Sequence, residues 1–103
     1  MFVADLKIDH NRLAELCDEY GIVRLEVFGS FASGDAGDTS DVDLLVTFRD
    51  GVSLGLRYLD LRSGLADILG REVDLHERTS VEASANKYFR KYALEHVEQL
   101  YAA

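Results

Sequence analysis

Three aspartates stand in or beside segments that are otherwise typical of β-strands: Asp41, Asp43 and Asp74. Asp41 and Asp43 are two residues apart, so both carboxylates project from the same face of one strand. Neighbouring carboxylates repel and raise each other's pKa, and a cation between them removes that cost. Mg²⁺ takes carboxylate oxygens together with substrate phosphates, and no Cys or His cluster is present. The set therefore predicts Mg²⁺ rather than zinc.

Each aspartate also has a plainer interpretation. Asp41 could cap or turn the chain after Thr39 and Ser40, and Asp43 and Asp74 could be charges that keep an edge strand soluble. Asp43 suits that role poorly, because the run Val-Asp-Leu-Leu-Val around it is typical of a central strand. A plain role is the better interpretation of any one aspartate alone. The magnesium site rests on the three together.

Gly29 and Ser30 end the preceding predicted strand. Glycine lets the backbone approach a ligand closely, and the turn offers N–H groups and a hydroxyl to an anion. A Gly-Ser pair alone is equally typical of an ordinary turn after a strand. Here ten residues separate Ser30 from Asp41, and Asp43 follows, which gives the pattern G-S-(ten residues)-D-x-D. A phosphate cradle at one strand end and a metal pair on the adjacent strand are what nucleotidyl transfer requires.

The elements that must position these residues follow from hydrophobic periodicity and from capping residues. We expect a helix capped by Asp9 and ended by Gly21, strands over 22–28, 41–48 and 72–76, a polar turn over 33–40, a helix capped by Ser53 and ended by Gly70, and a last helix from about Val81 to Tyr101. The order predicts an α/β (α+β) fold, in which helices pack a small mixed sheet.

Composition and charge limit the classes of function that this chain can have. The 103 residues contain no proline and no linker-like stretch, so we expect residues 1–103 to form one domain. There is a single cysteine, no run long enough to cross a bilayer and no signal peptide, which makes the cytoplasm the expected compartment. The net charge of −8 argues against binding of nucleic acid by this chain alone. It suits a basic partner or bound cations, and equally a domain that is simply soluble.

Taken together, the segments Gly29–Asp35, Ser40–Val46 and Val73–Leu75 resemble the minimal nucleotidyltransferases of the DNA polymerase β superfamily. Many members of this family are antitoxins encoded beside a HEPN-domain toxin. The resemblance spans about residues 22–101, and it implies the polymerase β-like nucleotidyltransferase fold. The combination of Gly-Ser, Asp-x-Asp and a later strand aspartate is fairly specific.

The resemblance implies a role for each matching residue. Gly29 and Ser30 match the turn that binds the nucleotide phosphates, and Asp41 and Asp43 match the two metal-binding carboxylates. Asp74 matches the third carboxylate, which helps to orient the metal and to activate the attacking hydroxyl. The family further implies two Mg²⁺ ions, ATP as donor of AMP, and a tyrosine of a HEPN toxin as acceptor. It implies a hetero-oligomer with that toxin.

One residue departs from the family pattern. The family often reads G-S-x-A-R-G, and Ser33 stands here where the arginine would be. That removes a cation that could meet phosphate, and Arg49 and Arg57 could take its place. Two alternatives therefore stay open: a non-catalytic antitoxin that blocks its toxin sterically, and a nucleotidyltransferase for small molecules such as antibiotics. The short chain counts against the second, because no other domain is available to build a substrate pocket.

Two further features have mainly structural interpretations. His76 shares a strand face with Asp74 and could lie near the site, although a surface or packing role is the simpler expectation. The last predicted helix carries four aromatic residues: Tyr88, Phe89, Tyr92 and Tyr101. Aromatic residues are more often core than interface, but a domain this small cannot bury them all. This favours, modestly, a protein partner along the C-terminal helix.

Overall fold

A four-stranded mixed sheet organises residues 1–103, all of which the computed structural model describes. Its strands are β1 (Ile22–Phe28), β2 (Val42–Phe48), β3 (Val73–Glu77) and β4 (Glu98–Ala102). In the spatial order β3-β2-β1-β4, β1 lies antiparallel to both β2 and β4, and β2 runs parallel to β3. The predicted α/β architecture, a small mixed sheet packed by helices, is confirmed.

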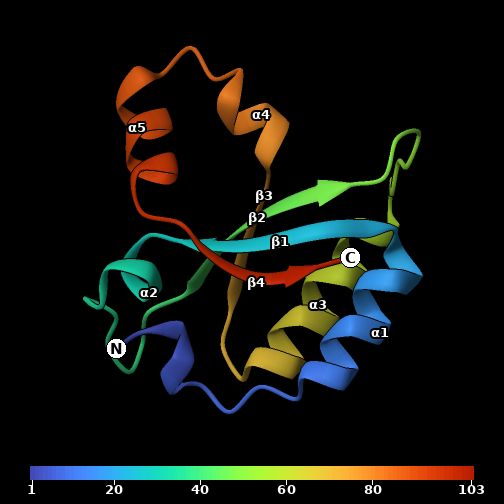
Figure 1. The fold of residues 1–103 in the computed structure, drawn as a ribbon, viewed down its shortest axis with the longest axis horizontal. Helices are drawn as coiled ribbons and strands as arrows, with labels where there is room; N and C mark the ends of the chain where they lie inside the picture. The colour runs from blue at the N-terminus through green and yellow to red at the C-terminus, as the bar shows by residue number, and fades with distance from the viewer.

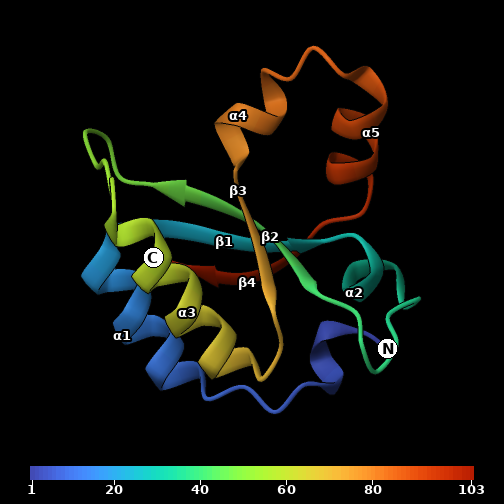
Figure 2. The same cartoon turned by 180° about the vertical axis from the view of Figure 1, so that it is seen from behind.

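Two pairs of helices cover the two faces of the sheet. α1 (His10–Tyr20) and α3 (Arg57–Leu69) lie on one face, and α4 (Arg78–Glu82) and α5 (Lys87–Glu95) lie on the other (Figure 1, and from behind in Figure 2). The short α2 (Ser30–Ser33) follows β1 at one end of the sheet, and a 3₁₀ turn (Val3–Asp5) precedes α1. None of the helices combines the length and hydrophobicity needed to cross a membrane.

Side chains along β2 alternate between two apolar clusters. Val42, Leu44 and Val46 belong to the large cluster that the sheet forms with α1 and α3. Leu45 points the other way, into a small cluster with one buried residue from each of β1, β2, α4 and α5: Phe28, Leu45, Val81 and Ala93. Asp43 is two residues from Leu45 and shares its face. The carboxylate therefore lies on the more thinly covered side of the sheet.

The first predicted helix is confirmed, and the start of the second is wrong. The Asp9 carboxylate accepts hydrogen bonds from the N–H groups of the first turn of α1, and Gly21 ends that helix with a φ of +72°. α3 ends at Gly70 as expected, but it begins at Arg57, and no side chain caps it. Ser53 is not the cap, because the residues between it and Arg57 form a turn that includes Gly55 with a φ of +56°.

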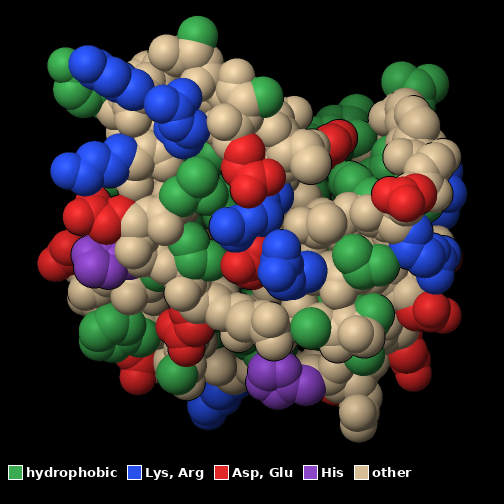
Figure 3. Space-filling view, turned by 45° about the horizontal axis from the view of Figure 1, so that its top comes forward, with side chains coloured by type: hydrophobic (Ala, Val, Ile, Leu, Met, Phe, Trp, Pro, Cys, Tyr) green, Lys and Arg blue, Asp and Glu red, His purple; other side chains and the backbone are tan.

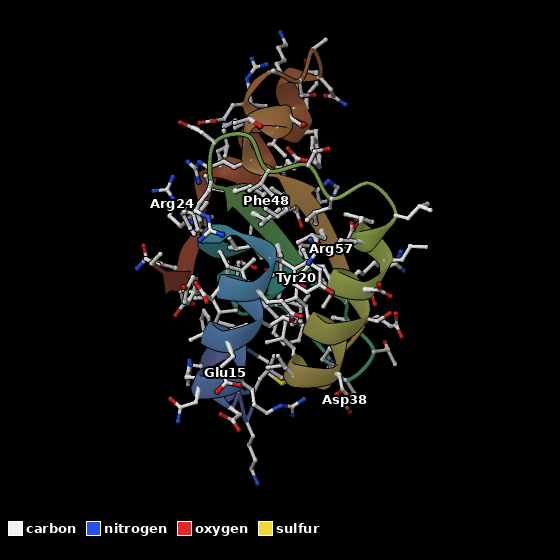
Figure 4. The ribbon with its side chains drawn as sticks, turned by 90° about the vertical axis from the view of Figure 1, so that its right-hand side faces the viewer. Glu15, Tyr20, Arg24, Asp38, Phe48 and Arg57 are labelled. Atoms are coloured by element: carbon white, nitrogen blue, oxygen red, sulfur yellow. The ribbon has the colours of Figure 1, made fainter.

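α1 and α3 pack side by side against the sheet. Leu61 and Leu65 of α3 are fully buried, and Gly64 lets α3 approach the side chain of Leu16 in α1 closely. At the ends of the two helices, Tyr20 and Arg57 point toward each other, with the guanidinium carbon 4.7 Å from the ring centroid (Figure 4). The larger part of the core thus supports the sheet face that lies opposite the aspartates.

The expected last helix from about Val81 to Tyr101 is wrong. The chain instead forms α4, α5 and the edge strand β4. Asn86 starts a new helix, because its side-chain oxygen accepts the N–H groups of Tyr88 and Phe89. β4 then pairs with the free edge of β1. The apparent helical stripe is divided between two faces: Phe89, Ala93 and Val97 pack in the small cluster, and Leu100 packs against the large one.

Glu26 of β1 is held by an ion pair that ties α4 to the sheet. It is 9% exposed, and its Oε1 lies 2.7 Å from Nη1 of Arg78. We expect Arg78→Ala to lower the free energy of unfolding by about 2 kcal/mol, because the substitution leaves the buried carboxylate with only the longer contact to Arg24 at 3.4 Å. Arg12→Ala is the control, since Arg12 pairs with Asp67 on the surface at 3.3 Å and such pairs contribute under about 1 kcal/mol. Equal losses in urea denaturation would contradict this assignment.

Candidate active site

The structure places two of the predicted carboxylates side by side on neighbouring strands. Asp43 in β2 and Asp74 in β3 are direct partners in the parallel register. Neighbouring strands lie about 4.8 Å apart, and opposed residues project from the same face. Asp41 immediately precedes β2, two residues before Asp43, and its charge acts on the Asp43 carboxyl. The two strand ends therefore present three acidic residues to one region.

The electrostatic state of Asp43 reflects this crowding. Its carboxyl is half-buried, and burial is the main cause that raises its pKa above the ordinary value of 3.8. The negative charge of Asp74 raises the pKa further, His76 partly opposes the rise, and Asp41 adds to it. The surroundings of Asp43 thus disfavour its charged form, and a bound cation would stabilise that form.

His76 lies beside the site rather than away from it. Its Nε2 is 3.1 Å from Oδ2 of Asp74, which makes an ion pair whenever the imidazole is protonated. The ring is held between Phe28 and Phe89, with both ring centroids 5.7 Å away. His76 therefore combines the packing role expected from the sequence with a contact to Asp74. Through that contact it can orient the carboxylate.

Gly29 lies directly against Asp43. The residue before it, Phe28, is the register partner of Asp43 across β1 and β2. Gly29 adopts a φ of +71° and a ψ of −147°, a region open to glycine almost alone. A Cβ here would overlap the Asp43 carboxylate and lie 3.0 Å from the hydroxyl of Tyr92. The backbone at this turn therefore approaches a carboxylate of the candidate site closely, and its contact with phosphate stays a prediction. Ser30 follows as the first residue of α2.

Ser33 stands where the family often has an arginine, and neither Arg49 nor Arg57 replaces that cation at the site. Ser33 Oγ lies 3.0 Å from Oδ2 of Asp35. Arg57 stacks on Tyr20 between α1 and α3. Arg49 reaches the surroundings of Gly21, just before β1 begins, whereas Asp43 pairs with the far end of that strand.

Arg71, which the sequence did not single out, comes nearer to the site. Its Nη1 donates to the carbonyl oxygens of Gly37 at 2.8 Å and Ser40 at 3.3 Å, in the turn that leads to Asp41. It also lines, with Asp41, a hollow of about 410 Å³. A cation thus reaches the neighbourhood of Asp41 from the start of β3 rather than from α2.

Tyr92 is the second residue that sequence reasoning did not place at the site. We expected it in the core or at a partner surface, but its hydroxyl lies next to Gly29 and Asp43. Its ring packs edge to face on Phe28, with centroids 6.2 Å apart. No local pattern reveals this position, because it depends on where α5 packs after the break at Asn86.

The donor set fits a hard divalent cation by chemical type. It consists of carboxylates without a Cys or His cluster, and His76 compensates the charge of Asp43 only in part. However, no group of three or more His, Cys, Asp and Glu side chains is arranged to hold a metal ion in this structure. Mg²⁺ at these residues is therefore a prediction from donor chemistry and electrostatics. It is not an observed centre.

Comparisons with known proteins agree with this picture. The family model described as nucleotidyltransferase domain matches residues 11–99. The chain is 38% identical over 73 residues to the protein adenylyltransferase MntA of Thermococcus cleftensis, a match that covers 71% of this chain and 73% of that protein.

Solved structures share the fold over nearly the whole chain. A candidate minimal nucleotidyltransferase superposes with a TM-score of 0.67 at 33% identity, covering 98% of this chain and 96% of that one. A toxin–antitoxin structure with AMP-PNP gives 0.65 at 23% identity, with 93% and 75% covered. A complex of a tri-AMPylated Shewanella oneidensis HEPN toxin with an MNT antitoxin gives 0.56 at 22% identity, with 91% and 70% covered. At identities of 22% and 23%, the last two show a shared fold.

Proposed function

This chain belongs to the nucleotidyltransferase domain family, and we propose that it transfers AMP from ATP to a tyrosine hydroxyl of a HEPN-domain toxin and so acts as an antitoxin. The observation that carries the proposal is the register pair of Asp43 and Asp74 beside Gly29. The relative MntA, a protein adenylyltransferase, supports the reaction. The fold shared with the complex of a tri-AMPylated HEPN toxin and an MNT antitoxin supports the partner and the hetero-oligomer.

Each site residue has a role in this proposal. Gly29 and Ser30 let the triphosphate approach the backbone at the start of α2. Asp41, Asp43 and Asp74 would hold Mg²⁺, two ions by analogy with the family. When bound, Mg²⁺ supplies electrostatic stabilisation of charge on the phosphoryl oxygens.

Asp74 is the carboxylate that we assign to receive the proton of the acceptor hydroxyl. His76, 3.1 Å away, orients it. The rest of the chain positions the reactants, as the protein does in other phosphoryl transfers. The half-buried Asp43 contributes negative charge in a place where water screens it incompletely.

Intact-mass analysis of the partner tests the proposal directly. A HEPN-domain toxin that binds this chain is incubated with the purified protein, Mg²⁺ and each NTP in turn. We expect the toxin to gain the mass of one or more AMP groups with ATP, and peptide mapping to place them on tyrosine. A toxin that gains no mass with any NTP, although the two proteins bind each other, would refute the enzymatic proposal.

A non-catalytic antitoxin is the second candidate, and the surroundings of Ser33 favour it. Ser33 contacts the acidic Asp35 at the position where the resemblance leads one to expect a cation. In that case the Asp43→Asn variant would still neutralise the toxin in cells, with no mass added to it. Loss of neutralisation in Asp43→Asn, with binding to the toxin retained, selects the enzyme.

A further inference from the structure

Tyr92 places a phenol within the candidate site. Its hydroxyl lies 3.0 Å from the point that a Cβ on Gly29 would occupy, and the Asp43 carboxylate lies closer still to the same point. Gly29 marks the phosphate-binding turn, and Asp43 marks the catalytic carboxylates of the proposed function. A nucleotide whose phosphates met this turn and these carboxylates would therefore lie next to this hydroxyl.

The position of the hydroxyl is set by packing on both sides of the residue. Ala93, the next residue along α5, is fully buried in the small apolar cluster, and Phe89 and Leu94 pack against that cluster. The ring of Tyr92 meets the buried Phe28 at an interplanar angle of 82°. Tyr92 as a whole is still 55% exposed, so the phenol is accessible and its helix is anchored. A hydroxyl held in line with the phosphorus that it attacks reacts far faster than the same group free in solution.

None of the other four tyrosines has this placement. Tyr20 lies under Arg57 on the opposite face of the sheet, and the Tyr58 hydroxyl donates to the carbonyl of Leu75 at 2.9 Å. Tyr101 belongs to β4 and packs against the large cluster. Tyr88, one turn before Tyr92 on α5, is 77% exposed and has Lys87 over its ring.

α5 carries a local excess of positive charge, and its basic residues line a hollow of their own with Leu94 and Glu95. The chain carries a net charge of −8, yet three basic residues lie within five positions of α5: Lys87, Arg90 and Lys91. Figure 3 shows lysine and arginine side chains gathered at the corner that α5 forms. A local positive patch on an acidic protein raises the local concentration of an anion there.

We propose that Tyr92 is an internal acceptor: the chain adenylylates its own Tyr92, in cis, when no partner hydroxyl occupies the site. The inference rests on the proposed function, because it uses the same donor and the same carboxylates. The phenolic oxygen attacks the α-phosphorus of ATP and forms the new O–P bond. The bond from that phosphorus to the bridging oxygen breaks, and pyrophosphate leaves with the electron pair. The phenolic proton passes to the Asp74 carboxylate.

The test is intact-mass analysis of the purified full chain, incubated alone with ATP and Mg²⁺ and then mapped by peptide. We expect a gain of one AMP on Tyr92, complete loss of that gain in Tyr92→Phe, and a gain equal to wild type in Tyr88→Phe. Tyr88 is the matched control, because it lies on the same helix and is the more exposed of the two. A reaction in cis also requires a rate constant that does not change with protein concentration.

Three outcomes would overturn the proposal. The label could map to another residue, or the rate could rise in proportion to protein concentration, which would mean that one copy modifies another. The wild-type chain could also stay unlabelled while it adenylylates the toxin under the same conditions. In that case the proposed function holds, and Tyr92 lies next to the nucleotide but does not accept the AMP group. If neither protein gains mass, the proposed function fails as well.

Discussion

Asp43→Asn is expected to abolish nucleotidyl transfer and to stabilise the fold at the same time. The amide keeps the shape of the side chain but removes the negative charge at the centre of the acidic group. That charge would help to hold Mg²⁺, and a bound metal ion contributes several kcal/mol to the stabilisation of a phosphoryl-transfer transition state, so we expect a loss on the order of a thousandfold in rate. Transfer of labelled AMP from ATP to the HEPN toxin measures the effect.

The stabilisation follows from the raised pKa of Asp43. Burial and the charges of Asp74 and Asp41 hold that pKa above its ordinary value of 3.8, so the folded state binds this proton more tightly than the unfolded state does. The metal-free wild-type protein therefore loses stability as the pH rises from about 3.8 through the raised pKa. Asp43→Asn lacks that loss, and its Tm in EDTA should exceed that of wild type at neutral pH.

A surface aspartate provides the matched control for both effects. Asp50→Asn changes an exposed residue in the turn after β2 and should alter neither the rate nor the Tm. If Asp43→Asn lowers the Tm in EDTA at neutral pH, the carboxylate is stabilising in the folded state, and our account of the site's electrostatics is wrong. Substantial activity in Asp43→Asn would remove the carboxylate from the mechanism.

The central strands were predictable because their residues carry a local pattern. In β2, apolar residues alternate between two faces, and residues 22–28 are rich in strand-forming side chains that end at a glycine. β4 has no such pattern of its own. Its residues continue the helical spacing of α5, and it becomes a strand because β1 offers a free edge. That preference is tertiary, and a local pattern does not contain it.

The residues of the candidate site also fall into two groups: those that a local pattern predicts and those that only tertiary packing places. The shared face of Asp41 and Asp43 follows from strand geometry, and Gly29 from its place at a strand end. The register that sets Asp74 opposite Asp43 depends on how α3 returns the chain to the sheet. The positions of Tyr92 and Arg71 depend on the packing of other elements, and no residue spacing in the sequence predicts them. The placement of Tyr92 beside Gly29 and of Arg71 beside the turn before Asp41 therefore had to come from the structure.

The arrangement also explains why the site can be strained without loss of the fold. The large cluster, with 17 buried residues, lies on the α1 and α3 face of the sheet. The aspartates project from the other face, where only four residues form the small cluster. Repulsion among the carboxylates thus acts on the weaker layer, while the sheet is held by the stronger one.

Gly29→Ala is expected to damage the site and the fold together. At a φ of +71° and a ψ of −147°, a residue with a Cβ costs about 1–3 kcal/mol in backbone strain. The added methyl group would also overlap the Asp43 carboxylate and crowd the Tyr92 hydroxyl. A shift of the carboxylate by about 1 Å is enough to lower the rate by roughly a hundredfold. Denaturation and AMP transfer measure the two losses separately.

Gly37→Ala separates this local effect from the general cost of replacing glycine. Gly37 lies in the turn between α2 and β2, has no positive φ, and has no atom within 4 Å of where its Cβ would be. We expect this variant to retain wild-type stability and rate. If Gly29→Ala matches it in both measurements, the backbone at residue 29 has room for a side chain, and the close approach of Gly29 to Asp43 does not shape the site. If Gly29→Ala loses activity but no stability, the cost lies in the displaced carboxylate, and the strained backbone conformation carries little of it.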